Sequence, residues 1–173
     1  LGSTGSIGFT TLDIICKNKK LFDIELLSTN RNIKKIKYQI KNFKVKNIII
    51  HDKKIFDKNK FYFEKLNVNV YQNLKDFKRE FKKKLDYTMC AITGLEGLEP
   101  TLEIIQLTKR IAIANKESII CGWNLIKRKL KKHKTEFIPI DSEHFSIFEL
   151  IKNEKLENIK KIYITASGGP FLN

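Results

Sequence analysis

The sequence has 173 residues, of which 42% are hydrophobic and 31% charged, and its formal net charge at pH 7 is +15. This composition is typical of a folded globular domain with a sizeable core and excludes a disordered chain. No apolar run reaches the length of a membrane-spanning helix. Three widely spaced cysteines (Cys16, Cys90 and Cys121) indicate neither a disulfide framework nor a zinc site.

The basic residues favour a solvated, lysine-rich surface over a surface that binds nucleic acid. Only four of the 34 are arginine, the residue that nucleic-acid readers use most, and the lysines are spread over the whole chain. Such a surface would still steer anionic substrates toward the protein. We expect a cytoplasmic protein, because no secretory signal is present. An organellar protein that has lost a leader is the alternative, since the chain starts at Leu1.

Strand and helix patterns alternate along the whole chain. In order, the pattern predicts a helix at 7–18, a strand at 22–27, a helix at 33–43, a strand at 47–51, a helix at 57–66, a strand at 68–71, a helix at 74–84, a strand at 87–93, a helix at 95–107, a strand at 110–114, a helix at 118–132, a strand at 137–140, a helix at 142–152 and a strand at 161–165. This alternation predicts an α/β fold, with a Rossmann-like parallel sheet and helices on both faces.

Residues 1–8 (Leu-Gly-Ser-Thr-Gly-Ser-Ile-Gly) match a phosphate-binding turn. In a strand–turn–helix unit, a first glycine such as Gly2 permits the tight turn and a second, Gly5, lets the backbone approach a pyrophosphate. The third, Gly8, lets the helix and strand pack closely. The phosphate would then meet free N–H groups at the helix N-terminus. Glycines at this spacing also occur in ordinary loops, which is the alternative for the motif taken alone.

The loop at residues 29–32 (Thr-Asn-Arg-Asn) lies where NAD-binding folds usually carry an acidic residue for the ribose hydroxyls. No carboxylate is present in it. A guanidinium at Arg31 would bind a 2′-phosphate through charge-assisted hydrogen bonds, so the loop favours NADP(H) over NAD(H). The alternative is that Arg31 is an ordinary surface residue and that Asn32 caps the next helix.

Two further clusters follow predicted strands. Asp141 and Glu143 lie just past the strand at 137–140, where open α/β sheets bind their ligands, and two carboxylates suit Mg²⁺ or Mn²⁺. The alternative is that Asp141 and Ser142 cap the following helix. Lys116, after the strand at 110–114, is a candidate cation for substrate oxygens. Its alternative is a turn residue beside a helix cap.

Four stretches together resemble the 1-deoxy-D-xylulose 5-phosphate reductoisomerase family: residues 1–8, 114–118 (Ala-Asn-Lys-Glu-Ser), 139–144 (Pro-Ile-Asp-Ser-Glu-His) and 165–171 (Thr-Ala-Ser-Gly-Gly-Pro-Phe). The resemblance implies NADPH-dependent, divalent-metal-dependent isomerisation and reduction of 1-deoxy-D-xylulose 5-phosphate to 2-C-methyl-D-erythritol 4-phosphate. This reaction belongs to the non-mevalonate route of isoprenoid biosynthesis. The resemblance also implies an NADPH-binding Rossmann-like domain at 1–140 and the beginning of an α/β catalytic domain at 141–173.

The resemblance assigns roles to particular residues. Those that would bind the cofactor are Thr4, Gly5, Ser6, Ile7, Asn30, Arg31, Asn32, Asn115 and Glu117. Those that would contact the substrate are Lys116, Ser142, Glu143 and Ser167, and the metal ligands would be Asp141 and Glu143. Catalysis would rest on Lys116, Asp141 and Glu143. Two positions depart from the family pattern: Asn30 replaces a common glycine, and Arg31 replaces the usual lysine and keeps its charge.

Family members are about twice as long, and their later segments supply a lid, a third carboxylate ligand and further phosphate-binding residues. We therefore expect a fragment that binds NADPH and does not turn over alone, from a protein that is a homodimer when complete. One rival is another NADP-dependent dehydrogenase, which would need its own catalytic cysteine, Tyr–Lys pair or histidine. The other is a basic nucleic-acid-binding domain, which leaves the glycine turn unexplained. The expected partner is a small sugar phosphate, with no nucleic acid and no membrane.

Overall fold

The computed structural model describes residues 1–140 and 142–163, without the side chains of residues 142 and 143. The chain divides into two compact units, Leu1–Ile138 and Pro139–Asn173. This division lies close to the predicted boundary between residues 140 and 141. That the first unit is an NADPH-binding domain and the second the start of a catalytic domain remains a prediction from the resemblance.

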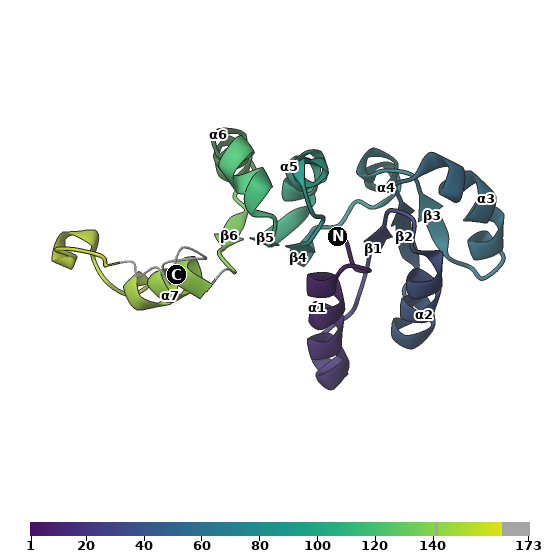
Figure 1. Ribbon diagram of the computed structural model, residues 1–173, viewed down its shortest axis with the longest axis horizontal. Coiled ribbons are helices and arrows are strands. Elements are labelled where there is room, and N and C mark those ends of the chain that lie inside the picture. Colours follow the sequence, from purple (N-terminus) through teal and green to yellow (C-terminus); the bar gives the residue numbers. More distant parts are fainter. Residues whose placement is uncertain (141, 164–173) are drawn as a thin grey trace, which may run out of the picture. The chain divides into compact units, whose positions relative to one another are not determined.

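Helices and strands alternate through the first unit (Figure 1). Its elements are α1 (Ser6–Lys17), η1 (Lys19–Leu21), β1 (Leu27–Thr29), α2 (Ile33–Phe43), β2 (Asn47–Ile50), α3 (Lys53–Glu64), β3 (Asn69–Tyr71), α4 (Leu74–Glu80), β4 (Leu85–Cys90), η2 (Leu95–Gly97), α5 (Leu98–Ile104), η3 (Ile105–Leu107), β5 (Thr108–Ile113), α6 (Lys116–His133) and β6 (Glu136–Ile138), where η marks a short 3-10 helix. All strand pairs are parallel, as the alternation predicts.

The strands form two three-stranded sheets, β1-β2-β3 and β4-β5-β6. Residues 1–3 lie between them. On one side the Leu1 carbonyl accepts a hydrogen bond from the Ala91 N–H at 2.9 Å, and on the other the Ser3 N–H donates to the Ser28 carbonyl at 3.0 Å. The order across the first unit is therefore β3-β2-β1, residues 1–3, β4-β5-β6, which is the order of a doubly wound fold.

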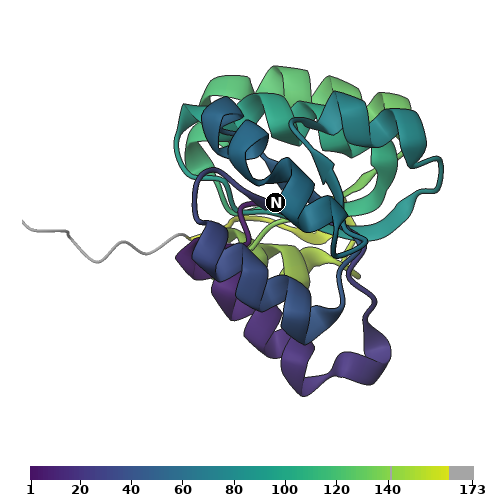
Figure 2. The same cartoon turned by 90° about the vertical axis from the view of Figure 1, so that its right-hand side faces the viewer.

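Helices cover both faces of this sheet because the strands are apolar on both sides. Ile48 and Ile50 of β2 belong to a core with α1, α2 and α3, whereas Ile49 belongs to a second core with α4, α5 and α6. All three side chains are fully buried. Figure 2 shows α1 and α2 on the side of the sheet opposite to the helices of the second core. Successive strand residues point to opposite faces, so one run of isoleucines serves two cores.

Several predicted boundaries are wrong, although α2 has the predicted bounds. The strand predicted at 22–27 is β1 at Leu27–Thr29, and the helix predicted at 74–84 ends at Glu80. The helix predicted at 95–107 consists of α5 between two short 3-10 helices. Helix α3 begins at Lys53 and not at residue 57, because the Asp52 side chain caps it by accepting a hydrogen bond from the Ile55 N–H.

The cysteines differ in accessibility. Cys16 and Cys121 are exposed, whereas Cys90 at the end of β4 is 2% exposed, and burial raises the pKa of its thiol. Only the thiolate reacts rapidly with disulfide reagents. We therefore expect such a reagent to modify two thiols in the folded chain at neutral pH and the third only on unfolding. In a Cys90→Ala variant, the reagent should modify two thiols in the folded chain and the same two in the unfolded chain. Three equally fast thiols in the folded chain would contradict this expectation.

The second unit contains α7 (Ser142–Ile151) and η4 (Leu156–Asn158) in its described part. Helix α7 agrees closely with the helix predicted at 142–152. The strand predicted at 161–165 is not confirmed, since residues 161–163 have no regular secondary structure and the remainder lies outside the described residues. Over the described part of the chain, no helix has both the length and the apolar character that crossing a membrane requires.

Candidate functional site at the carboxyl edge of the sheet

The reversal of strand order at residues 1–3 defines where a ligand would bind. In doubly wound sheets, ligands occupy the crevice outside the carboxyl ends of the strands, at the point where the order reverses. Three loops surround this point: the glycine turn after residues 1–3, the loop at 91–94 after β4 and residues 114–115 after β5. The loop at 29–32 follows β1 on the other side. The sequence-predicted residues of the first unit all lie at this edge.

The glycine turn presents the N-terminus of α1 without a side-chain cap. Gly5 is the N-cap residue and offers no side-chain acceptor, whereas α2, α3, α4 and α6 are each capped by an Asn or Asp side chain. Gly5, Ser6 and Ile7 are exposed. The first N–H groups of a helix have no acceptor within the helix, and its dipole favours an anion there. This end of α1 is therefore suited to a phosphate.

Buried hydrogen bonds hold the backbone of the glycine turn in place. Ser3 is 5% exposed, and its hydroxyl donates to the Gln39 amide oxygen at 2.8 Å, while the Gln39 amide nitrogen donates to the Ser3 carbonyl at 2.8 Å. Gly2 adopts a φ of +74°, and its N–H donates to the Ser28 hydroxyl at 2.7 Å. The buried side chains of Ser28 in β1 and Gln39 in α2 thus fix the backbone that leads into residues 4–7.

The loop after β1 lies beside the turn. The Thr4 and Thr29 hydroxyls are 3.0 Å apart in a hydrogen bond, and Asn32 caps α2 by accepting from the Lys35 N–H at 3.0 Å. Arg31 is exposed, and its Nε donates to a carboxylate oxygen of Asp52 at 2.7 Å. The cap alternative is therefore right for Asn32, whereas the binding of a 2′-phosphate by Arg31 remains a prediction.

Sequence reasoning missed two charged residues at this edge, Asp52 and Lys35. The Lys35 ammonium donates to the Thr4 carbonyl at 3.1 Å, so a second cation lies beside the glycine turn. A signal for Asp52 was present. It follows the buried strand Asn47–Ile50 by two residues, at the position of a helix cap, and adjacent parallel strands bring their following loops to one edge.

Asn115 is occupied by structural hydrogen bonds. It is 4% exposed; its amide donates to the carbonyls of Ile92, at 2.6 Å, and Gly94, and its oxygen accepts from the Ser118 N–H at 2.9 Å. Its side chain therefore joins the loop after β4 to the start of α6. Lys116 and Glu117 follow in the first turn of α6 and are exposed. Within the described residues neither side chain has a hydrogen-bond or ion-pair partner, and the ligand roles of Asn115, Lys116 and Glu117 remain predictions.

The motif at 139–144 belongs to the second unit. Asp141 and Ser167 lie outside the described residues, as do the side chains of Ser142 and Glu143, although the backbone of residues 142 and 143 opens α7. In the part of the chain that is described, no group of three or more histidine, cysteine, aspartate or glutamate residues is arranged to hold a metal ion. The metal and substrate roles of these residues remain predictions.

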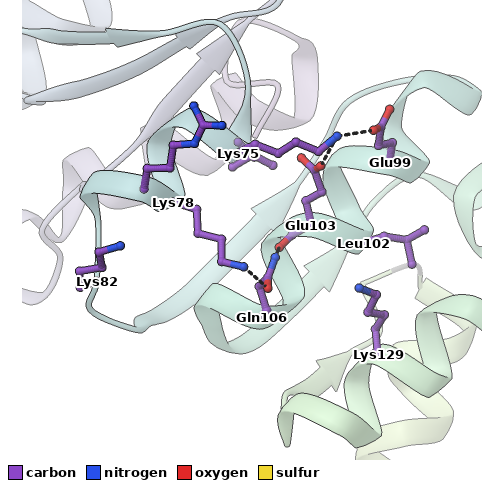
Figure 3. A pocket seen from close by; sticks show the side chains of 10 residues that line it. Lys75, Lys78, Lys82, Glu99, Leu102, Glu103, Gln106 and Lys129 are labelled. Carbon is purple, nitrogen blue, oxygen red and sulfur yellow. Dashed lines mark hydrogen bonds and ion pairs between the residues drawn. The ribbon is translucent and has the colours of Figure 1, made fainter.

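A cavity of about 630 Å³ lies elsewhere, between α4, α5 and α6, and contains none of the predicted site residues (Figure 3). There Lys75 pairs with Glu99 and Glu103 at 3.5 and 3.4 Å. Lys75 follows Tyr71 at the Tyr-x-x-x-Lys spacing of some dehydrogenases. However, the Tyr71 hydroxyl donates to Glu80 at 2.7 Å, and burial, reinforced by Glu80, raises its pKa to about 12. Both groups are engaged in other contacts, so they form no catalytic pair.

The parallel sheet, the reversal of strand order and the glycine turn define a Rossmann-like protein of the doubly wound α/β class. The family model of 1-deoxy-D-xylulose 5-phosphate reductoisomerase matches residues 1–122, and that of the C-terminal domain of the same enzyme matches residues 137–173. The chain belongs to the 1-deoxy-D-xylulose 5-phosphate reductoisomerase family.

Relatives and solved structures agree with this assignment. The 1-deoxy-D-xylulose 5-phosphate reductoisomerase of Pelagibacter ubique (strain HTCC1062) is 56% identical over 99% of this chain and 45% of its own length. The Zymomonas mobilis enzyme in complex with NADPH is 35% identical, with a TM-score of 0.87 over 99% of this chain and 45% of that one. A reductoisomerase in complex with NADPH, fosmidomycin and magnesium is 28% identical, with a TM-score of 0.77 over 88% of this chain and 39% of that one. The chain thus spans less than half the length of these proteins.

Proposed function

We propose that this chain is the NADPH-binding part, and the beginning of the catalytic part, of an enzyme that isomerises and reduces 1-deoxy-D-xylulose 5-phosphate to 2-C-methyl-D-erythritol 4-phosphate. The observation that carries the proposal is the exposed, uncapped N-terminus of α1 at the point where the strand order reverses. Family membership supplies the reaction. It favours this enzyme over the two rivals, an unrelated NADP-dependent dehydrogenase and a nucleic-acid-binding domain.

The residues at this edge fit a dinucleotide phosphate. Thr4, Gly5, Ser6 and Ile7 surround the free N–H groups of α1, where a pyrophosphate would be held by hydrogen bonds and by the helix dipole. Gly5 lacks a side chain that would keep a phosphate away from the backbone. When bound, NADPH supplies the hydride that reduces the aldehyde. The turn fixes the cofactor, so the protein contributes orientation.

On the adenosine side, Arg31 would bind a 2′-phosphate, and Asn30 and Asn32 would shape the loop around the ribose. The Arg31 side chain is 73% exposed and its Nε is already engaged by Asp52, which leaves its two Nη groups for a phosphate. Glu117, in the first turn of α6, and Asn115, the N-cap of that helix, would complete the cofactor site. Lys116 would place a positive charge against the oxygens of the substrate.

Asp141 and Glu143 are proposed as metal ligands, with Ser142, Glu143 and Ser167 as substrate contacts. The support is the resemblance of the motifs at 139–144 and 165–171, together with the preference of Mg²⁺ and Mn²⁺ for carboxylate oxygens. A bound divalent metal would polarise the substrate carbonyl during the rearrangement. Lys116, Asp141 and Glu143 are the residues on which we expect catalysis to depend.

We also propose that the complete protein is a cytoplasmic homodimer that takes a small sugar phosphate and does not bind nucleic acid. Two of the similar solved structures are complexes with small ligands, namely NADPH, magnesium and fosmidomycin. The predominance of lysine over arginine supports a solvated surface.

The cofactor part of the proposal is tested by titrating the chain with NADPH and with NADH, followed by fluorescence. We expect a marked preference for NADPH. Arg31→Ala should weaken NADPH binding about ten- to a hundredfold and leave NADH binding unchanged, because one charge-assisted phosphate contact contributes about 1.5–3 kcal/mol.

Arg79→Ala is the matched control. Arg79 is also an exposed arginine paired with an aspartate, Asp76, but it lies in the last turn of α4. It should leave both affinities unchanged. Failure of a demonstrably folded chain to bind either nucleotide would contradict the proposed cofactor site, and an equal loss in both arginine variants would contradict the role of Arg31.

A further inference from the structure

Arg31 is held by one side of its guanidinium only. Its Nε donates to Asp52 at 2.7 Å, and within the described residues its Nη groups make no hydrogen bond. The side chain is otherwise free, with 73% of its surface exposed. An arginine loses much rotamer freedom when it grips a ligand, so an anchor that already fixes it lowers the cost of binding.

Asp52 is well suited to be this anchor because it is itself fixed. Its second carboxylate oxygen accepts from the Ile55 N–H at 3.0 Å as the N-cap of α3, and its side chain is only 17% exposed. The hydrogen bond from Ile55, reinforced by Arg31, lowers the pKa of Asp52. The carboxylate is therefore ionised throughout the neutral pH range, with one oxygen bonded to the Ile55 N–H and the other to the Arg31 Nε.

The backbone around this pair is also tied together. The His51 N–H donates to the Thr29 carbonyl at 3.0 Å, and the Asp52 N–H lies 3.4 Å from the Asn30 carbonyl. The Thr29 hydroxyl in turn contacts that of Thr4 in the glycine turn. The position of Arg31 relative to the uncapped end of α1 is therefore set by a continuous series of hydrogen bonds that includes Asp52.

We propose that Asp52 is a positioning residue that holds the Arg31 guanidinium with its Nη groups toward the 2′-phosphate of the cofactor, and so determines the preference for NADP(H) over NAD(H). This inference rests on the proposed function, in which NADPH binds at this edge. The Asp52 charge also repels the phosphate, but the site is open to water and ions, which screen that repulsion. Orientation of Arg31 is the larger effect.

Asp52→Asn separates the two roles of Asp52. Asparagine keeps a side-chain oxygen for the Ile55 N–H, since it caps helices as well as aspartate does. It loses the charge and the acceptor for Arg31. We expect the Kd for NADPH to rise about fivefold, as for other coupled contacts, and the Kd for NADH to change less than twofold. Asp52→Ser, which also keeps a cap, should give the same shift.

The same change in an Arg31→Ala background provides the decisive comparison. With no guanidinium to orient, Asp52→Asn should leave NADPH binding unchanged or strengthen it, because a negative charge near the phosphate is removed. Asp86→Asn is the matched control: Asp86 pairs with Lys109 at 2.7 Å on β4, and its loss should move neither Kd. Unfolding midpoints of all variants are measured alongside, and midpoints close to that of the wild type would exclude loss of folding as the cause of a changed Kd.

The outcomes separate this inference from the function on which it rests. If the wild-type chain is folded and binds no NADPH, the proposed function fails and this inference fails with it. If Arg31→Ala abolishes the preference for NADPH but Asp52→Asn leaves it intact, only the inference is overturned. An equal effect of Asp52→Asn with and without Arg31, or an equal loss for both cofactors, would make Asp52 a purely structural residue and would also overturn it.

Discussion

Gly8→Ala is expected to destabilise the fold by about 3 kcal/mol, the upper end of the usual cost of overpacking, because the added methyl group meets backbone that is held in place. A Cβ at Gly8 would lie 2.6 Å from the Ser3 Cα, too close for two carbon atoms that share no covalent bond or common neighbour. Ser3 is unable to move away, since Gln39 and Ser28 hold it through buried hydrogen bonds. The gain in helix propensity from glycine to alanine, about 1 kcal/mol, is too small to compensate.

Gly5→Ala is the matched comparison within the same turn. A Cβ there would lie 3.5 Å from the Gly2 carbonyl oxygen, an ordinary contact, and the Gly5 φ of −78° suits any residue. Its stability should stay within about 0.5 kcal/mol of the wild type. NADPH binding should weaken about tenfold or more, because the methyl group would keep the pyrophosphate from the backbone.

Urea unfolding and NADPH titration of both variants check these two expectations. A wild-type unfolding midpoint for Gly8→Ala would show that Ser3 yields, contrary to the rigidity argued from its hydrogen bonds. Unimpaired NADPH binding by Gly5→Ala would show that a cofactor does not approach the turn at that residue.

Asn115→Ala is expected to cost about 3 kcal/mol of stability. It removes the cap of α6, worth about 1 kcal/mol, and leaves the partly buried carbonyls of Ile92 and Gly94 without their donor. Asn73→Ala is the control, because Asn73 caps α4 by accepting one hydrogen bond, from the Asp76 N–H at 2.9 Å. It should cost only about 1 kcal/mol. Equal losses in urea unfolding would contradict the bridging role of Asn115.

The bounds of an element were predictable from the sequence where its hydrophobic periodicity and its cap residue agreed. Helix α2 has an apolar stripe and the cap residue Asn32, and its bounds are those predicted. The strand at β1 was misplaced because residues 22–26 alternate like a strand, yet they lie outside the sheet. The true strand ends in Ser28 and Thr29, whose burial is compensated by hydrogen bonds to the glycine turn. Those bonds join segments far apart in the chain, which local patterns do not reveal.

The same limit applies to the candidate site. Residues 4–7 and Arg31 were identifiable from motif and charge, because glycine spacing and an isolated arginine are local features. The pairing of Arg31 with Asp52 links residues 21 positions apart and depends on β1 lying beside β2. The occupied side chain of Asn115 depends on the loop after β4. Strand order decides both contacts, and periodicity does not specify strand order.

The bridging position of residues 1–3 has a consequence for folding on the ribosome. This segment is synthesised before both of its neighbours, and the hydrogen bond from the Leu1 nitrogen to the Met89 carbonyl closes a separation of 88 residues. The half that contains β1 to β3 has its own core and can collapse early. The two halves join only after β4 has emerged from the ribosome. Until then, residues 1–3 pair with β1 on one side and have no strand on the other. Long closures of this kind slow folding, so we expect the edge that carries the candidate site to assemble late in the folding of each new molecule.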